Sequence, residues 1–151
     1  MPSRHRSRQR ALQVLFLIDI RNQQPEEGIA AYCGTLHSEE GEEAAPEDPF
    51  MEQLVKGAAA RREQIDQRIA ERSEHWRLDR MPVVDRNILR LALYEMLWVG
   101  TPPAVVIDEA LELARRFAGE ESVAFINGVL DAIRREAAEQ AAEDPKSAPA
   151  R

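Results

Sequence analysis

The chain has 151 residues, of which 44% are hydrophobic and 31% charged, so it is a globular chain of one domain or two very small ones and not a disordered chain. Its one cysteine, Cys33, excludes an intramolecular disulfide and a zinc-finger ligand set. The net charge is −7, but residues 1–18 contain four arginines and no acid, which gives +4 there and −11 elsewhere. A basic arm on an acidic body attracts a polyanion and confines it to one face.

The basic start and the apolar run 14–18 together are similar to a signal peptide, but the run is too short for one. Gln13 interrupts it on one side, and Asp19 and Arg21 close it on the other, with no small-residue cleavage site after them. No apolar stretch approaches the length of a membrane span. We therefore expect a cytoplasmic protein that does not contact a membrane.

The spacing of apolar residues predicts six helices. They span residues 4–23, 26–37, 49–73, 83–99, 104–117 and 120–138. In the first helix, arginines at alternate positions would be spread around the circumference instead of forming one stripe. We therefore expect the first few residues to be extended and mobile, with the helix becoming firm near Ser7 or Arg8.

The segments between these helices have the composition of loops and helix ends. Residues 38–48 are rich in Glu, Gly, Ala and Pro and predict an acidic surface loop. Asp48 and Pro49 suit the N-cap and first turn of the third helix. Gly100 suits the C-terminal end of the fourth, with prolines after it to prevent continuation.

No segment shows the alternation of a half-buried strand, so the predicted fold class is all-α with about six to seven helices. The loops divide the chain into four parts. We expect an N-terminal helical subdomain with the basic arm (1–74), a connector (75–82), a C-terminal helical subdomain (83–138) and a disordered tail (139–151).

The polar residues do not form a catalytic pattern. The three histidines are scattered, no two of them stand at metal-ligand spacing, and the acids fit solvated helix faces better than a catalytic pair. We therefore predict no catalytic residue, no metal and no cofactor. Glu95 lies on an otherwise apolar helix face, so it should be ion-paired or hydrogen-bonded.

Four motifs resemble those of the NusB family of bacterial transcription antitermination factors, in the family's order and over about residues 4–135. They are Arg8–Phe16, Val84–Glu95, Ile107–Arg115 and Phe125–Asp131. One departure is Asp108, where the family often has Asn. The resemblance implies a NusB-like helical bundle of two small subdomains that binds single-stranded boxA RNA. It also implies a heterodimer with the ribosomal protein NusE and an antitermination complex with elongating RNA polymerase that supports ribosomal RNA transcription.

The candidate RNA site begins with the arm, whose charge suits phosphate contact although a solvated basic start is the plainer interpretation. The arginines are Arg4, Arg6, Arg8 and Arg10. The resemblance adds Glu121, Ser122 and Phe125 and places this turn beside the arm. From the residues alone, Phe125 is better explained as a core phenylalanine.

The candidate partner surface comes from the resemblance, which places Phe16, Asp85 and Asp79 where NusE binds. An aromatic side chain ringed by acids suits a basic ribosomal protein. The alternatives are a core-rim phenylalanine and, for Asp85, an early-helix acid favoured by the helix dipole. A homodimer of the free chain stays open.

Two other functions compete with an RNA-binding factor. Some RNA methyltransferases carry a NusB-like helical domain ahead of the catalytic domain, but this chain has no glycine-rich cofactor loop. A helical protein-interaction module, in which the arm is incidental, is the other. We expect a non-enzymatic protein.

Overall fold

The computed structural model describes residues 3–40, 48–73 and 77–143, and of residues 35–40 it describes the backbone alone. Within these ranges the chain is helical and contains no strand, so the predicted all-α class is confirmed. The elements in chain order are α1 (Arg4–Arg21), α2 (Pro25–Glu40), α3 (Pro49–Ala60), α4 (Arg62–Arg72), the 3-10 helix η1 (Leu78–Arg80), α5 (Val83–Tyr94), the π-helical turn η2 (Glu95–Val99), α6 (Pro103–Phe117) and α7 (Glu120–Glu143). No helix in the described ranges is long and apolar enough to cross a bilayer.

Helix α1 begins at the first arginine. The Ser3 side chain accepts a hydrogen bond from the backbone N–H of Arg6 at 3.1 Å, and Asn22 ends the helix in the left-handed conformation, with φ of 53°. The prediction that the first residues are extended is therefore wrong from Arg4 onward. A capping serine satisfies an N–H of the first turn, so the helix begins there despite the scattered arginines.

The predicted helix 49–73 is broken at Arg61, whose backbone (φ −111°, ψ 16°) ends α3 and precedes α4. One turn earlier, Gly57 lies so close to Tyr94 of α5 that a Cβ atom there would overlap the ring. Helix α3 packs on α1 and α5, whereas α4 packs on α5 and α7. The break lets both helices bury their apolar residues in different directions, which one straight helix could not do.

Two predicted loop boundaries also differ. Residues 38–40 belong to α2, and Asp48 is a buried N-cap, so of the predicted acidic loop 38–48 only residues 41–47 lie outside the described residues. Helix α7 continues to Glu143, so the predicted disordered tail is wrong for residues 139–143. Gly100 ends η2 as expected, with φ of 84° and its N–H donating to the Glu95 carbonyl at 3.0 Å.

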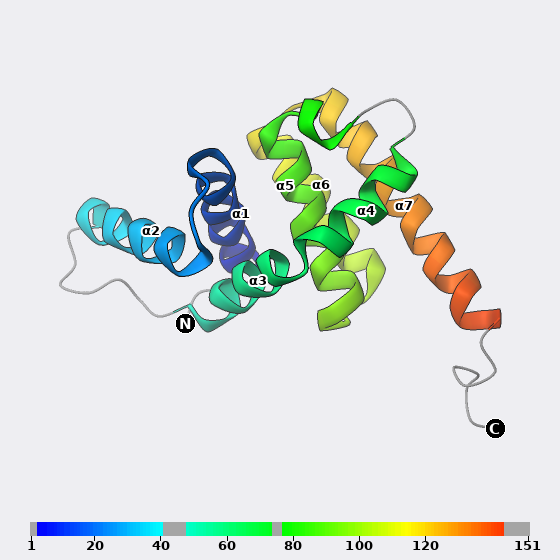
Figure 1. Cartoon of the computed structure of the whole chain (residues 1–151), viewed down its shortest axis with the longest axis horizontal. Coiled ribbons are helices and arrows are strands. Elements are labelled where there is room, and N and C mark those ends of the chain that lie inside the picture. The colour runs from blue at the N-terminus through cyan, green and yellow to red at the C-terminus, as the bar shows by residue number, and fades with distance from the viewer. Residues whose placement is uncertain (1–2, 41–47, 74–76, 144–151) are drawn as a thin grey trace, which may run out of the picture.

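Helix α5 occupies the centre of the molecule and contacts α1, α3, α4, α6 and α7 (Figure 1). Helices α1, α2 and α3 gather on one side of it, and α4, α6 and α7 on the other. The buried apolar side chains of both sides form one continuous cluster. The sequence assigns residues 62–72 to the first group, but α4 packs with the second. The division into two subdomains itself stays a prediction.

Candidate nucleic-acid and partner interface

The four arginines at the start of α1 fall into two classes. Arg4 and Arg6 are exposed, whereas Arg8 and Arg10 are 5% and 6% exposed. Helix geometry explains the position of Arg8, because it precedes Ala11 by three residues and therefore lies on the apolar stripe that packs inward. Half of the predicted basic arm is thus inside the protein.

Arg8 forms a buried, bidentate ion pair with Glu95. Its Nε and Nη2 atoms donate to the two Glu95 oxygens at 2.7 and 2.6 Å, and the side chains are 6% and 2% exposed. The hydrogen bond to Glu95 raises the pKa of Arg8, desolvation acts in the opposite direction, and the charges of Glu95 and Glu109 reinforce the rise. The expected partner of Glu95 is confirmed, and Arg8 is not available to phosphate.

Asp48 ties the start of α1 to the start of α3. Its carboxylate accepts hydrogen bonds from the Ser7 hydroxyl at 2.6 Å, from Arg10 Nη1 at 3.4 Å and from the backbone N–H of Met51 at 3.0 Å. One buried carboxylate therefore caps α3 and also holds two side chains of α1. Arg10, like Arg8, is corrected from an RNA contact to a structural residue.

The outward side of the α1 start combines cations with an aromatic ring. Arg4 lies over Phe50, with Cζ 4.4 Å from the ring centroid, and Arg6, two residues further along α1, is also exposed. His5 contacts Glu109, with Nδ1 2.7 Å from Oε2. We call Arg4, Arg6 and Phe50 the α1 edge. Single-stranded nucleic acid sites combine cationic and aromatic side chains in this way.

The first turn of α7 is bound to the start of α5. The Ser122 hydroxyl lies 2.8 and 2.9 Å from the two oxygens of Asp85, which is 4% exposed. Burial raises the pKa of Asp85, and the Ser122 hydrogen bond acts against that rise. The predicted surface position of Asp85 is wrong because the residue is buried, whereas Ser122 is half-buried and its contact with RNA stays a prediction. Glu121 is exposed, and Phe125 is half-buried against the core.

The basic arm and the start of α7 lie at opposite ends of α5. We call residues 121–125 at the start of α7 the α7 turn. Helices α1 and α5 run antiparallel, since Arg8 meets Glu95 at one end and Asp19 meets Arg86 at the other. Ser122 reaches the start of α5, ten residues before Glu95 and therefore about 15 Å from it along the helix. The expectation that the turn lies beside the arm is wrong (Figure 1).

The predicted partner residues Phe16 and Asp79 remain at the surface. Phe16 is half-buried on α1, and Ile20, one turn later, is 56% exposed. Asp79 is exposed in η1. Arg86 joins the two elements by donating to Asp19 of α1 at 2.6 and 2.8 Å and to the Leu78 carbonyl at 3.2 Å. We call Phe16, Ile20 and Asp79 the α1–η1 face.

Beneath this face a charge cluster joins α1, α4 and α5. Arg90 contacts Asp19 at 2.9 Å and Asp66 at 2.8 Å. Burial is the largest single influence on the pKa of Asp19 and raises it, but hydrogen bonds from Arg86 and Asn87 and the charges of Arg90 and Arg86 outweigh it, so the pKa is lowered. The cluster holds Asp19 ionised and fixes η1 relative to α1.

The whole chain is similar to proteins of one family. Residues 5–135 match the model described as the NusB family. The transcription antitermination protein NusB of Solibacter usitatus is 56% identical over 151 residues, covering 100% of this chain and 98% of that protein. The chain belongs to the NusB family. The NusB of Streptomyces coelicolor is 47% identical over 89% of this chain and 94% of its own length.

Solved NusB structures share this fold. NusB from T. maritima superposes with a TM-score of 0.75 at 33% identity, covering 89% of this chain and 92% of that chain. A chain from a structure of NusB and NusE in complex with dsRNA gives a TM-score of 0.74 at 29% identity, covering 89% and 99%. The four NusB-like motifs fall on α1, on α5 continuing into η2, on α6 and on α7.

Neither a group of metal ligands nor an activated thiol is found among the described residues of this NusB-family chain. In the part of the chain that the structure describes, no three His, Cys, Asp or Glu side chains are grouped to hold a metal ion. Burial raises the pKa of the Cys33 thiol, which keeps it protonated and weakly nucleophilic. Ile20 and the Asp19 cluster are the residues that sequence reasoning missed, although Ile20 stands four residues after Phe16, at helical spacing.

Proposed function

We propose that this NusB-family chain is a cytoplasmic, non-enzymatic antitermination factor. It binds boxA-type single-stranded RNA together with the ribosomal protein NusE and links both to elongating RNA polymerase, which supports ribosomal RNA transcription. The observation that carries the proposal is the match to antitermination proteins over the full length of the chain. A similar solved chain comes from a complex of NusB and NusE with dsRNA, which supports both partners.

The RNA contacts divide between the two ends of α5. At the α1 edge, Arg4 and Arg6 hold phosphates, which positions the RNA without selecting a sequence. At the α7 turn, Phe125 and Glu121 contact unstacked bases. An RNA that touches both groups crosses the surface roughly parallel to the buried α5, whose twelve residues are about 18 Å long. Such a length requires several nucleotides and suits an extended single strand.

The α1–η1 face receives NusE. Phe16 and Ile20 supply apolar area on adjacent helical turns, and Asp79 supplies negative charge at the rim. A basic ribosomal protein matches both, because apolar anchors give affinity and rim charges raise the association rate.

The test is a titration of boxA RNA with the chain, with NusE and with their equimolar mixture. The mixture should bind boxA at least about tenfold more tightly than either protein alone and more tightly than a scrambled RNA of equal length. Equal affinity for boxA and scrambled RNA under all conditions would contradict boxA recognition.

The partner face is tested by capture of NusE. Phe16→Ala should weaken capture by about 2 kcal/mol, as expected for an aromatic anchor. Asp79→Lys should mainly slow association, whereas Asp108→Lys, an exposed acid on α6, serves as the matched control. Undiminished capture by Phe16→Ala would remove this face from the proposal.

A further inference from the structure

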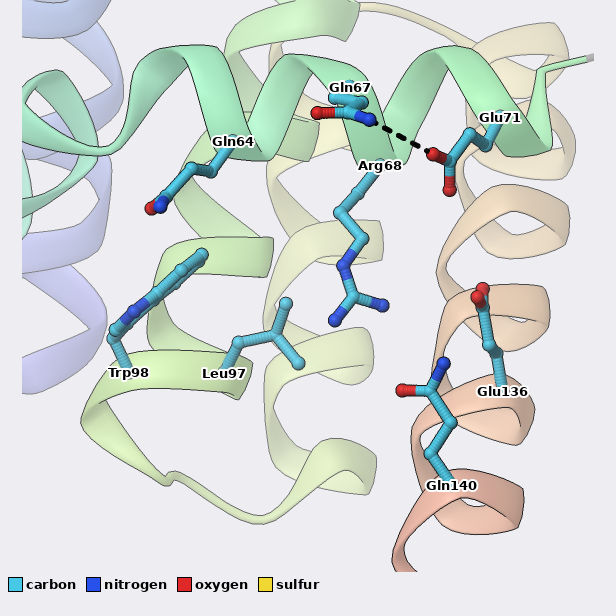
Figure 2. A pocket seen from close by; sticks show the side chains of 8 residues that line it. All are labelled: Gln64, Gln67, Arg68, Glu71, Leu97, Trp98, Glu136 and Gln140. Carbon is cyan, nitrogen blue, oxygen red and sulfur yellow. Dashed lines mark hydrogen bonds between the residues drawn. The ribbon is translucent and has the colours of Figure 1, made fainter.

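A polar pocket of about 540 Å³ opens between α4, η2 and α7 (Figure 2). Neither predicted site includes any of its residues. They are Gln64, Gln67, Arg68, Glu71, Leu97, Trp98, Glu136 and Gln140. Its volume is within the range of sites that hold small molecules in proteins. We call it the α4–α7 pocket.

Arg68 supplies a cation that the protein itself leaves unused. Its guanidinium points into the pocket in Figure 2, and none of the described residues hydrogen-bonds or ion-pairs with it. Of the two carboxylates of the lining, one is ion-paired and the other accepts a hydrogen bond from a neutral amide. Glu136 is 2.7 Å from Arg72, and Glu71 accepts a hydrogen bond from Gln67 at 3.5 Å. A guanidinium with its donors available suits a phosphate or carboxylate.

The rest of the lining suits a planar base. Gln64 and Gln140 extend from opposite walls. A glutamine amide has both a donor and an acceptor, and because Gln64 Oε1 already accepts a hydrogen bond from Arg61 at 3.4 Å, Gln64 offers mainly its NH2 group. Leu97 and Trp98 form an apolar wall. Trp98 is held in place by Tyr94, stacked at 6.2 Å between centroids, and by Arg61, 5.1 Å from its ring. An acidic peptide would use Arg68 alone, whereas a nucleotide uses the cation, the amides and the wall.

We propose that the α4–α7 pocket binds a nucleotide. Arg68 contacts the phosphate, the glutamine amides contact the edge of the base, and the base lies against Leu97 and Trp98. The nucleotide is either free or a single unit of a longer RNA. The proposal does not rest on the boxA function, because one nucleotide fills the site.

The direct test follows Trp98 fluorescence. The chain has two tryptophans, so Trp76→Phe leaves Trp98 as its single reporter. Titration with UMP and AMP in phosphate-free buffer at constant ionic strength should give a saturable change. Arg68→Gln should weaken binding by at least about tenfold, the loss expected for a charge-assisted hydrogen bond. The matched control is Arg134→Gln, an exposed arginine of α7 that pairs with Asp131 outside the pocket.

A second measurement on the unaltered chain guards against effects of the tryptophan change. In ¹H–¹⁵N spectra, the side-chain amides of Gln64 and Gln140 should shift with added nucleotide and saturate at the same concentration. Absence of saturable change in both measurements overturns the proposal, as does binding that Arg68→Gln leaves intact. Saturation by a glutamate-rich peptide but not by nucleotides also overturns it, in favour of a protein partner.

The source of the nucleotide is resolved with RNA. If Arg68→Gln weakens both UMP binding and binding of a single-stranded RNA, the pocket holds one unit of the RNA. If it weakens UMP binding alone, the ligand is a free nucleotide. Both results support the pocket. Loss of boxA recognition with UMP binding retained would count against the proposed function and leave the pocket in place.

Discussion

The start of α1 and the start of α7 are both predicted from the sequence to contact RNA, yet they use their polar groups differently. At α1, Arg8 and Arg10 are buried with carboxylates, and Arg4 and Arg6 face solvent. At α7, Ser122 is bound to Asp85, and Glu121 faces solvent. The number of charged residues along a helix is therefore not the number of charges available to a ligand.

The buried groups of the two regions also differ in how they are compensated. Glu95 at the α1 end meets a guanidinium through two hydrogen bonds, whereas Asp85 at the α7 end meets, among the described side chains, only the hydroxyl of Ser122. A buried carboxylate without a cation is costly in its charged form. Substitutions in each of the two regions therefore differ in their expected effects on stability and on RNA binding.

Removal of one partner of the Arg8–Glu95 pair should destabilise the fold by about 3–5 kcal/mol, because the other charge stays buried and unpaired. Urea denaturation of Arg8→Ala gives the value. Arg4→Ala, at the exposed site four residues earlier, is the matched control and should change stability by less than about 0.5 kcal/mol. Similar effects at both positions would mean that the arginines do not divide into two classes.

Loss of the Phe125 ring should weaken RNA binding by about 1–3 kcal/mol if a base stacks on it. Phe125→Leu keeps an apolar side chain against the core, so thermal unfolding should stay close to that of the unaltered chain. Phe50→Leu makes the same change at the α1 edge. The RNA affinities of the two variants, compared with each other, show which region contributes more to RNA binding. An unchanged affinity for Phe125→Leu would leave that ring a core residue only.

Asp85→Asn should stabilise the chain at neutral pH by about 1 kcal/mol, because it removes a desolvated charge and keeps an acceptor for Ser122. Since the pKa of Asp85 in the folded chain is raised above its ordinary value of 3.8, ionisation of Asp85 lowers stability as pH rises through the folded pKa. The stability that Asp85→Asn gains over the unaltered chain should therefore decrease as pH falls toward 3.8. Thermal unfolding across that window checks the sign, and a gain that grows at low pH would contradict it.

Arg4→Gln and Arg6→Gln should each reduce the slope of log affinity for single-stranded RNA against log salt concentration by about 0.7, one phosphate contact each. Arg10→Gln should leave the slope unchanged, because Arg10 is buried with Asp48. RNA titrations at several salt concentrations measure all three. Equal slopes for the three variants would place the phosphate contacts elsewhere.

Local patterns predicted the helices well, but the contacts between helices depend on where each helix lies. Helical spacing places both Glu95 and Arg8 on otherwise apolar helix faces, so each is predicted to need a partner. Spacing within a helix cannot show that they pair with each other, because they are 87 residues apart in the sequence. The apolar spacing of residues 49–73 also continues across Arg61. The break there depends on α3 meeting Tyr94 while α4 follows α5 and α7.

The candidate sites divide in the same way. Phe16, Asp79, Arg4 and Arg6 lie at least partly at the surface, because the exposure of such a residue depends mainly on the face of its own helix. The burial of Asp85 could not be predicted, because the hydroxyl that it contacts belongs to Ser122, 37 residues away. The α4–α7 pocket could not be predicted, since its lining comes from three segments whose residues are ordinary for helix surfaces.

The contact between Gly57 and Tyr94 connects position 57 to the α4–α7 pocket, which Gly57 does not line. A methyl group at position 57 could not be accommodated without moving the Tyr94 ring, and that ring stacks on Trp98. Trp98 in turn forms a wall of the α4–α7 pocket. In a screen of random variants, alanine at position 57 should therefore appear among the changes that alter ligand binding, although Gly57 itself lines no part of that pocket.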